Sequence, residues 1–191
     1  SLSVFPHDLP GIPSALPGTT PTPPSSGGAA ALEPVASFGE NPGGLAMYVH
    51  APTSLRAGAP VVGFVASGGA RLQEGHAALG GYGRIFRAAV RLSSAVPQVS
   101  IVTGVSAGGG AYSPALTDFV VMTRDARMFL TGPKIVRAAL AENVTMEELG
   151  GHGVHARNGV CQLVADDDAD AARLARELLG YLPARIGSPP P

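Results

Sequence analysis

Residues 97–123 read PQVSIVTGVSAGGGAYSPALTDFVVMT, and the order of elements in this segment indicates the fold class. A short apolar run, Val99–Thr103, leads into a glycine-rich turn, Gly104–Gly110. Ala111–Thr117 has the composition of a helix, and Phe119–Thr123 is a second apolar run. Apolar runs of this length between turn residues are typical of strands that are buried on both faces. The order strand, turn, helix, strand therefore predicts parallel β-structure covered by helices.

The same order occurs upstream of this stretch. Val61–Ala66 is a short apolar run, Ser67–Gly69 is a tight turn, and His76–Ser94 has apolar residues at helical spacing. Strands that alternate with helices indicate a layered α/β domain, in which the crossovers are right-handed. The other predicted elements are strands at Ala46–His50, Arg127–Leu130 and Gly159–Ala165, helices at Lys134–Leu140 and Ala169–Leu182, and a capping box at Thr145–Glu148 that ends at Gly150–Gly151.

The composition separates a compact region from an irregular beginning. The chain has 191 residues, of which 18 are proline, and residues 17–31 read PGTTPTPPSSGGAAA. Such a segment buries too little apolar surface to offset its ordering entropy, so residues 1–37 and 184–191 are predicted to be disordered tails. The net charge of −1 gives no electrostatic case for nucleic acid, and the single cysteine, Cys161, excludes an intrachain disulfide framework. These features favour a cytoplasmic protein.

Two glycine-rich turns carry the candidate chemistry. The first is Ala66–Arg71 and the second is Gly104–Gly110, and each follows a predicted buried strand. Turns at the carboxyl ends of parallel strands line ligand sites, and glycine lets backbone N–H groups approach a ligand closely. Two facing turns could each donate one N–H to an oxyanion. The alternative is that these glycines serve only turn geometry and close packing.

Six segments of the chain occur together in one known family, in the same order and at the same spacing. The segments are GAPVVGFVASGGARLQEG, YGRIF, VPQVSIVTGVSAGGGAYSPALTDFVVM, MFLTGP, VTMEELGG and NGVCQLVADD. Residues 58–183 thereby resemble the N-terminal domain of the carboxyltransferase β-subunit of biotin-dependent acyl-CoA carboxylases, of the propionyl-CoA and acetyl-CoA type. The resemblance implies an α/β, crotonase-like layered fold, of which this chain holds an incomplete part.

The resemblance also implies an activity, which is transfer of a carboxyl group from carboxybiotin to the α-carbon of an acyl-CoA. Carboxybiotin, carried on a partner protein, is thought to accept the α-proton itself, which agrees with the lack of an acid/base pair here. The implied partners are a biotin carboxylase/biotin-carrier α-subunit and other β-subunits, and no metal is implied. The implied cradle for the thioester oxygen is Gly69, Ala70, Gly108 and Gly109, and the implied contacts to acyl-CoA are Ser67, Gly68, Arg71, Ala107, Gly110 and Tyr112.

The chain also departs from the family pattern. Ala66 stands where the family has aspartate, which removes a polar turn residue but keeps the backbone cradle. The family's first strands and its C-terminal, biotin-side domain have no counterpart in this sequence. An incomplete chain is therefore expected, and whether it is an enzyme by itself stays open, with a non-catalytic interaction fragment as one alternative. The acyl-chain preference is also left open.

A second resemblance covers residues 38–57. Phe38–Pro52 followed by GAPVV is similar to the entry strands of polyhydroxyalkanoate-depolymerase-type esterases. Gly104–Gly108 also fits the G-x-S-x-G elbow of a serine hydrolase, with Ser106 as its nucleophile. The triad partners for that alternative would be Asp118 or Asp125 together with His152 or His155.

Other candidate residues have simpler explanations. His152 and His155 are three residues apart but lack the further ligands that a metal site needs, so they are expected to be loop or surface histidines. Cys161 lies in an apolar stretch and is expected in the core. Arg71, Arg84 and Arg87 could reach CoA phosphates, although ordinary solvation of a helix surface explains them equally well.

Overall fold

The computed structural model describes residues 33–34, 48–49, 58–70 and 72–189, and the chain divides into two units, residues 1–55 and 56–191. In the first unit, β1 (Glu33–Pro34) pairs antiparallel with β2 (Tyr48–Val49). β2 lies within the predicted strand at residues 46–50, whereas β1 lies in the segment predicted to be a disordered tail. The rest of that tail, and most of the esterase-like segment, fall outside the described residues.

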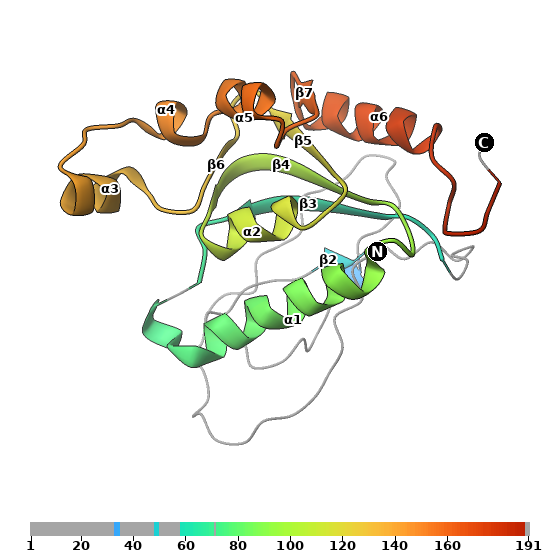
Figure 1. Cartoon of the computed structure of the whole chain (residues 1–191), viewed down its shortest axis with the longest axis horizontal. Helices are drawn as coiled ribbons and strands as arrows, with labels where there is room; N and C mark the ends of the chain where they lie inside the picture. The colour runs from blue at the N-terminus through green and yellow to red at the C-terminus, as the bar shows by residue number, and fades with distance from the viewer. Residues whose placement is uncertain (1–32, 35–47, 50–57, 71, 190–191) are drawn as a thin grey trace. The chain divides into compact units, whose positions relative to one another are not determined.

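The second unit contains a parallel sheet of five strands in its described part. The order is β3 (Val61–Ser67), β4 (Gln98–Ala107), β5 (Phe119–Thr123) and β7 (Leu163–Ala165), as Figure 1 shows. A fifth strand, β6 (Arg127–Phe129), pairs with the carboxyl end of β4. The predicted parallel arrangement is confirmed, because every strand pairing in this sheet is parallel.

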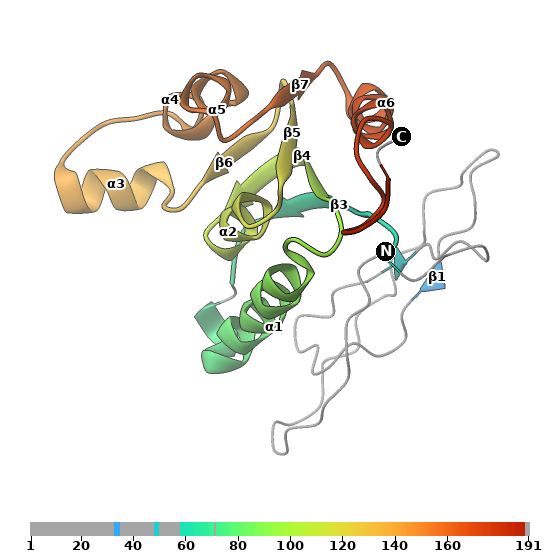
Figure 2. The same cartoon turned by 45° about the vertical axis from the view of Figure 1, so that its right-hand side comes forward.

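Helices cover both faces of the sheet. Figures 1 and 2 show α1 and α2 on one face and α6 on the opposite face. The helices are α1 (His76–Leu92), which follows a 3₁₀ turn at Leu72–Glu74, α2 (Gly109–Ala115), α3 (Pro133–Leu140), α4 (Met146–Gly150), α5 (His152–Asn158) and α6 (Asp168–Leu179).

Alternate residues of the central strands build two separate cores. Val99 and Ile101 of β4 pack with Ala171 and Ala175 of α6 in one cluster. Val102 faces the other way and packs in the second cluster with Ala111 of α2 and Cys161. This alternation is the two-residue period of a strand that is buried on both faces. Burial raises the pKa of the Cys161 thiol, so the thiol stays protonated and donates to the Leu163 carbonyl at 3.1 Å, as a core residue.

The strand β4 is longer than its composition predicts. The sequence indicates a turn from Gly104, but β4 continues to Ala107 and α2 begins at Gly109. The reason is tertiary, because β6 supplies a pairing partner for residues 105–107 of β4. Sequence patterns also missed α5, since its seven residues, HGVHARN, show no apolar periodicity.

A capping box begins α4, as the sequence predicts. The Thr145 Oγ1 accepts a hydrogen bond from the Glu148 N–H at 3.1 Å, and the Glu148 carboxylate accepts from the Thr145 N–H at 2.9 Å and from its hydroxyl at 2.8 Å. These bonds favour the charged carboxylate. The Thr145 N–H first, and then its hydroxyl, hold the pKa of Glu148 below its ordinary value.

We predict that Thr145→Val raises the Glu148 pKa toward its ordinary value, because the variant loses the hydroxyl and keeps the N–H. Since the folded pKa is lowered, the cap stabilises α4 above the ordinary glutamate pKa and loses this effect as the pH falls through the folded value. A carboxyl NMR titration of both proteins measures the shift. Superimposable Glu148 titration curves would contradict the predicted role of the hydroxyl.

The chain after α6 continues to contact the domain. The N–H of Ile186 donates to the Ala95 carbonyl at 2.9 Å, so residues 184–189, predicted to belong to a disordered tail, include a residue held against the loop before β4. No helix in the described ranges is long and apolar enough to cross a membrane.

Candidate functional site

The two glycine-rich turns touch each other at the carboxyl ends of β3 and β4. Gly69 has a φ of +93°, and a Cβ added there would lie 2.8 Å from the Ala107 carbonyl oxygen. Gly110 is the reciprocal case, since a Cβ added there would lie 2.8 Å from the Ser67 carbonyl oxygen. Glycine is therefore required on both sides of this contact, for conformation at Gly69 and for space at both positions.

Tyr82 of α1 connects the two turns and was not singled out by sequence reasoning. Its hydroxyl lies 2.7 Å from the Ser67 Oγ in the first turn. Its ring lies against the second turn, where a Cβ on Gly109 would come within 2.5 Å of the ring. The ring of Phe86, one helical turn along α1, lies 5.9 Å from that of Tyr82, and the ring of Tyr112 lies 6.0 Å from that of Phe86.

A signal for Tyr82 does exist in the sequence. Tyr82 and Phe86 are spaced i, i+4 on the helix that follows the first turn, so they share one face, and Phe86 belongs to the apolar spacing that predicts the buried face of that helix. A tyrosine on such a face brings a hydroxyl into a packed region, where it needs a partner. The serine of the adjacent turn is that partner here.

The four amides predicted to hold an oxyanion differ in their present partners. The Gly108 N–H donates to the Phe129 carbonyl of β6 at 3.1 Å, so this amide serves the structure. The Gly69 N–H makes a long hydrogen bond, 3.3 Å, to the Ser67 Oγ. The N–H groups of Ala70 and Gly109 donate to no group in the part of the chain that the structure describes. Gly109 is the first residue of α2, where an amide has no carbonyl one turn back.

The remaining predicted contact residues surround this cradle. Gly68 is exposed at the tip of the first turn, and a Cβ added there would meet nothing within 4 Å. Ala107 is the last residue of β4, and Tyr112, at 49% exposed, lies on α2 one turn after the cradle. Arg71 falls outside the described residues.

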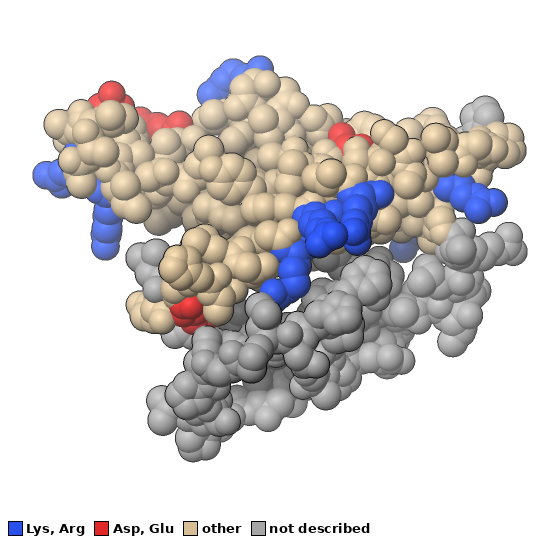
Figure 3. All heavy atoms as spheres, turned by 60° about the horizontal axis from the view of Figure 1, so that its bottom comes forward, with Lys and Arg blue, Asp and Glu red and all other residues tan. Residues whose placement is uncertain are grey.

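The outer surface of α1 is basic. Arg84, Arg87 and Arg91 are exposed on this helix, which contains no acidic residue. Figure 3 brings this side forward and shows Lys and Arg side chains gathered on it. Arg84 lies only two residues after Tyr82 on α1. The basic surface is therefore close in sequence to the residue that contacts both glycine turns.

Ser106 does not occupy the position of a hydrolase nucleophile. It lies inside β4, is fully buried, and its Oγ is 3.5 Å from the Val65 carbonyl oxygen. A nucleophile elbow instead exposes its serine at the tip of the strand-to-helix turn. The turn comes two residues later in this chain, at Gly108, so the G-x-S-x-G match reflects strand packing.

Three of the four proposed triad partners of Ser106 make hydrogen bonds elsewhere. Asp118 accepts the Gln98 N–H at 2.8 Å at the start of β4, which places it roughly 26 Å along the strand from Ser106 at 3.3 Å per residue. The Thr123 hydroxyl donates to Asp125 at 2.7 Å and holds the pKa of that carboxyl below its usual value. The His155 Nε2 lies 2.6 Å from the Met128 carbonyl oxygen. The described ranges contain no group of three or more His, Cys, Asp or Glu side chains placed to hold a metal ion.

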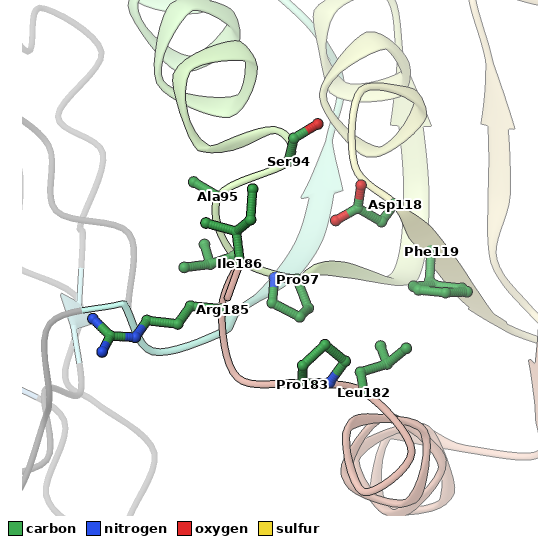
Figure 4. Close-up of a pocket in the computed structure, with 10 residues that line it drawn as sticks. Ser94, Ala95, Pro97, Asp118, Phe119, Leu182, Pro183, Arg185 and Ile186 are labelled. Carbon is green, nitrogen blue, oxygen red and sulfur yellow. The ribbon is translucent and has the colours of Figure 1, made fainter. Parts of the chain in front are cut away.

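A hollow of about 400 Å³ lies at the opposite end of the sheet (Figure 4). It is lined by the loop before β4, the start of β5 and the segment after α6, including Asp118 and Ile186. None of the residues predicted to form the oxyanion cradle or to contact acyl-CoA lines it. The glycine cradle is therefore the better candidate for the site.

Comparison with known proteins identifies the family of the chain. Residues 40–191 match the family model of the carboxyl transferase domain. Over 131 residues the chain is 50% identical to the methylmalonyl-CoA carboxyltransferase 12S subunit of Propionibacterium freudenreichii subsp. shermanii, covering 68% of this chain and 25% of that protein. It is 49% identical over 129 residues to the biotin-dependent acetyl-/propionyl-coenzyme A carboxylase beta6 subunit of Mycobacterium tuberculosis (strain ATCC 25618 / H37Rv), covering 67% of this chain and 27% of that protein.

Solved structures show the same relationship. The crystal structure of transcarboxylase 12S with hydrolysed methylmalonyl-coenzyme A bound superposes with a TM-score of 0.65 at 49% identity, over 67% of this chain and 26% of that one. The β-subunit of geranyl-CoA carboxylase from P. aeruginosa superposes with a TM-score of 0.54 at 41% identity, over 65% of this chain and 24% of that one. The predicted crotonase-like α/β fold is thereby confirmed, and the chain spans about a quarter of the length of these relatives. The chain belongs to the carboxyl transferase domain family.

Proposed function

We propose that this chain supplies the acyl-CoA side of a biotin-dependent carboxyltransferase, in which a carboxyl group passes from carboxybiotin to the α-carbon of an acyl-CoA of the acetyl/propionyl class. The observation that carries the proposal is the contact between the two glycine turns, with the amides of Ala70 and Gly109 left without a partner in the described chain. Support comes from relatives whose names state biotin dependence and CoA thioester substrates.

The chemistry needed from this chain is stabilisation of negative charge. Loss of the α-proton places enolate charge on the thioester oxygen, and N–H donors aimed at that oxygen lower the barrier. One such donor is typically worth about 3 kcal/mol in the transition state. In the proposal, Ala70 donates from the first turn and Gly109 from the second, while Gly69 and Gly108 shape the two turns. Carboxybiotin, held by a partner protein, would supply the carboxyl group and accept the α-proton.

The remaining parts of the proposal concern binding. Tyr112 and the exposed tip at Gly68 flank the cradle and would contact the pantetheine or acyl part of the substrate. Arg84 and Arg87 would attract the CoA phosphates to this side of the domain, since α1 carries no acidic residue to neutralise them. Further β-subunits and a biotin-carrier subunit are the partners proposed to complete the reaction.

The test is calorimetric titration of the full chain with propionyl-CoA, alongside free CoA. We expect propionyl-CoA to bind more tightly, because only the thioester has an oxygen for the two amides. The gain expected from two neutral hydrogen bonds is about 1–3 kcal/mol. Absence of binding heat for propionyl-CoA at millimolar concentration, from a sample that melts cooperatively, would refute retention of the acyl-CoA half-site.

A further inference from the structure

The strand β6 is the immediate support of the second glycine turn. It has three residues, Arg127–Phe129, and among the described strands of the sheet it pairs only with residues 105–107 of β4. Its last carbonyl, that of Phe129, accepts the Gly108 N–H at 3.1 Å. A displacement of β6 would therefore be transmitted directly to Gly108 and to the start of α2.

The pair α4–α5 holds β6 from its other side. Gly150 packs so closely on β6 that an added Cβ would overlap the Met128 carbonyl oxygen. Gly151 forms an isolated bridge with Arg127, and Arg127 forms an ion pair with Glu147 at 2.5 Å. That ion pair is partly exposed, so its contribution to the stability of this contact is expected to be small.

His155 provides the side-chain hydrogen bond from α5 to β6. Its Nε2 lies 2.6 Å from the Met128 carbonyl oxygen. A carbonyl only accepts, so Nε2 must carry the proton. The Nδ1 atom is buried and has no hydrogen-bond partner within the described chain. The imidazole is thus committed to one donor bond, and neither nitrogen is placed to ligate a metal or to exchange a proton with a ligand.

We infer that His155 is a positioning residue for the candidate site. Its Nε2–H fixes Met128, the adjacent Phe129 carbonyl fixes Gly108, and Gly108 sets the direction in which the Gly109 amide points. The effect of His155 on the backbone at Gly108 does not depend on what the site binds. The consequence for acyl-CoA binding rests on the proposed function.

The experiment compares variants of the full chain by amide hydrogen exchange and by titration with propionyl-CoA. His155→Met keeps the side-chain length but removes the donor, and His155→Gln retains an N–H donor near the position of Nε2. His152→Met is the matched control, because His152 lies on the same helix and has no hydrogen bond to β6 in the described chain.

For His155→Met we expect exchange of the Gly108 amide to accelerate about five- to tenfold, the net worth of one hydrogen bond. The core amides of Ile101 and Val121 should exchange as in the wild type. Affinity for propionyl-CoA should fall by a similar factor, His155→Gln should restore both readouts, and His152→Met should change neither.

Three results would overturn the inference: an unchanged Gly108 amide, equal acceleration at Gly108 and at the core amides, or the same effect from His152→Met. If His155→Met does not fold, the ring nitrogen NMR shifts of the wild type still decide, because a proton on Nδ1 instead of Nε2 would refute the bond to Met128. If the wild type binds no propionyl-CoA, the proposed function fails, while the exchange measurements still test His155.

Discussion

Gly69→Ala is expected to weaken propionyl-CoA binding by at least about tenfold, the net worth of one or two hydrogen bonds, while the sheet stays folded. The added Cβ would lie 2.8 Å from the Ala107 carbonyl oxygen, so the two turns must separate. The φ of +93° adds conformational strain for any residue with a Cβ. Both effects act at the cradle, because Gly69 lies in the turn after β3 and outside the two core clusters.

Gly83→Ala is the control for this variant. Gly83 is exposed on α1, and a Cβ added there would meet nothing within 4 Å. Calorimetric affinities and thermal melts of both variants separate a local effect from unfolding. Wild-type affinity in Gly69→Ala, or equal losses in both variants, would contradict the contact between the turns.

Gly150→Ala is expected to lower the free energy of unfolding by about 2–3 kcal/mol, as overpacking of a dense interior does. The new Cβ would overlap the backbone carbonyl of Met128 and lie 3.2 Å from the Phe129 Cβ. Neither group is the free end of a flexible side chain, and both residues are buried in β6, so the clash is relieved only by moving the strand.

Gly153→Ala is the control for this second variant. It adds a methyl group in the adjacent helix α5, where the nearest atom, on the Arg157 guanidinium, is 3.6 Å away. Alanine at a helical site is neutral or slightly stabilising relative to glycine. Chemical denaturation measures both variants, and a Gly150→Ala protein as stable as Gly153→Ala would show that β6 is not clamped by α4.

Much of the fold could be predicted from local patterns. The strand at 119–123 has the predicted limits, and the helices at 76–92 and 133–140 agree within two residues with their predicted spans. The capping box at Thr145 is where the sequence indicates it. These elements have continuous apolar runs, helical spacing or a specific cap, which are the signals that act over short range.

The parts that could not be predicted depend on contacts between distant segments. The extension of β4 to Ala107 requires β6, which lies twenty residues downstream, and the short polar helix α5 is held by its contacts with β6. Tyr82 contacts both turns only because α1 packs next to them in the folded domain. The G-x-S-x-G match failed for the same reason, because the pairing of β4 with β6 buries Ser106 in a strand.

In the proposed function, the backbone of the two facing glycine turns holds a thioester oxygen. The most direct measurement is a map of amide chemical shifts in the ¹⁵N-labelled chain during titration with propionyl-CoA and, separately, with free CoA. We predict that propionyl-CoA shifts the amides of Ala70 and Gly109 most strongly and that free CoA leaves these two largely unmoved. Equal shifts with both ligands, or shifts confined to other parts of the domain, would contradict the claim.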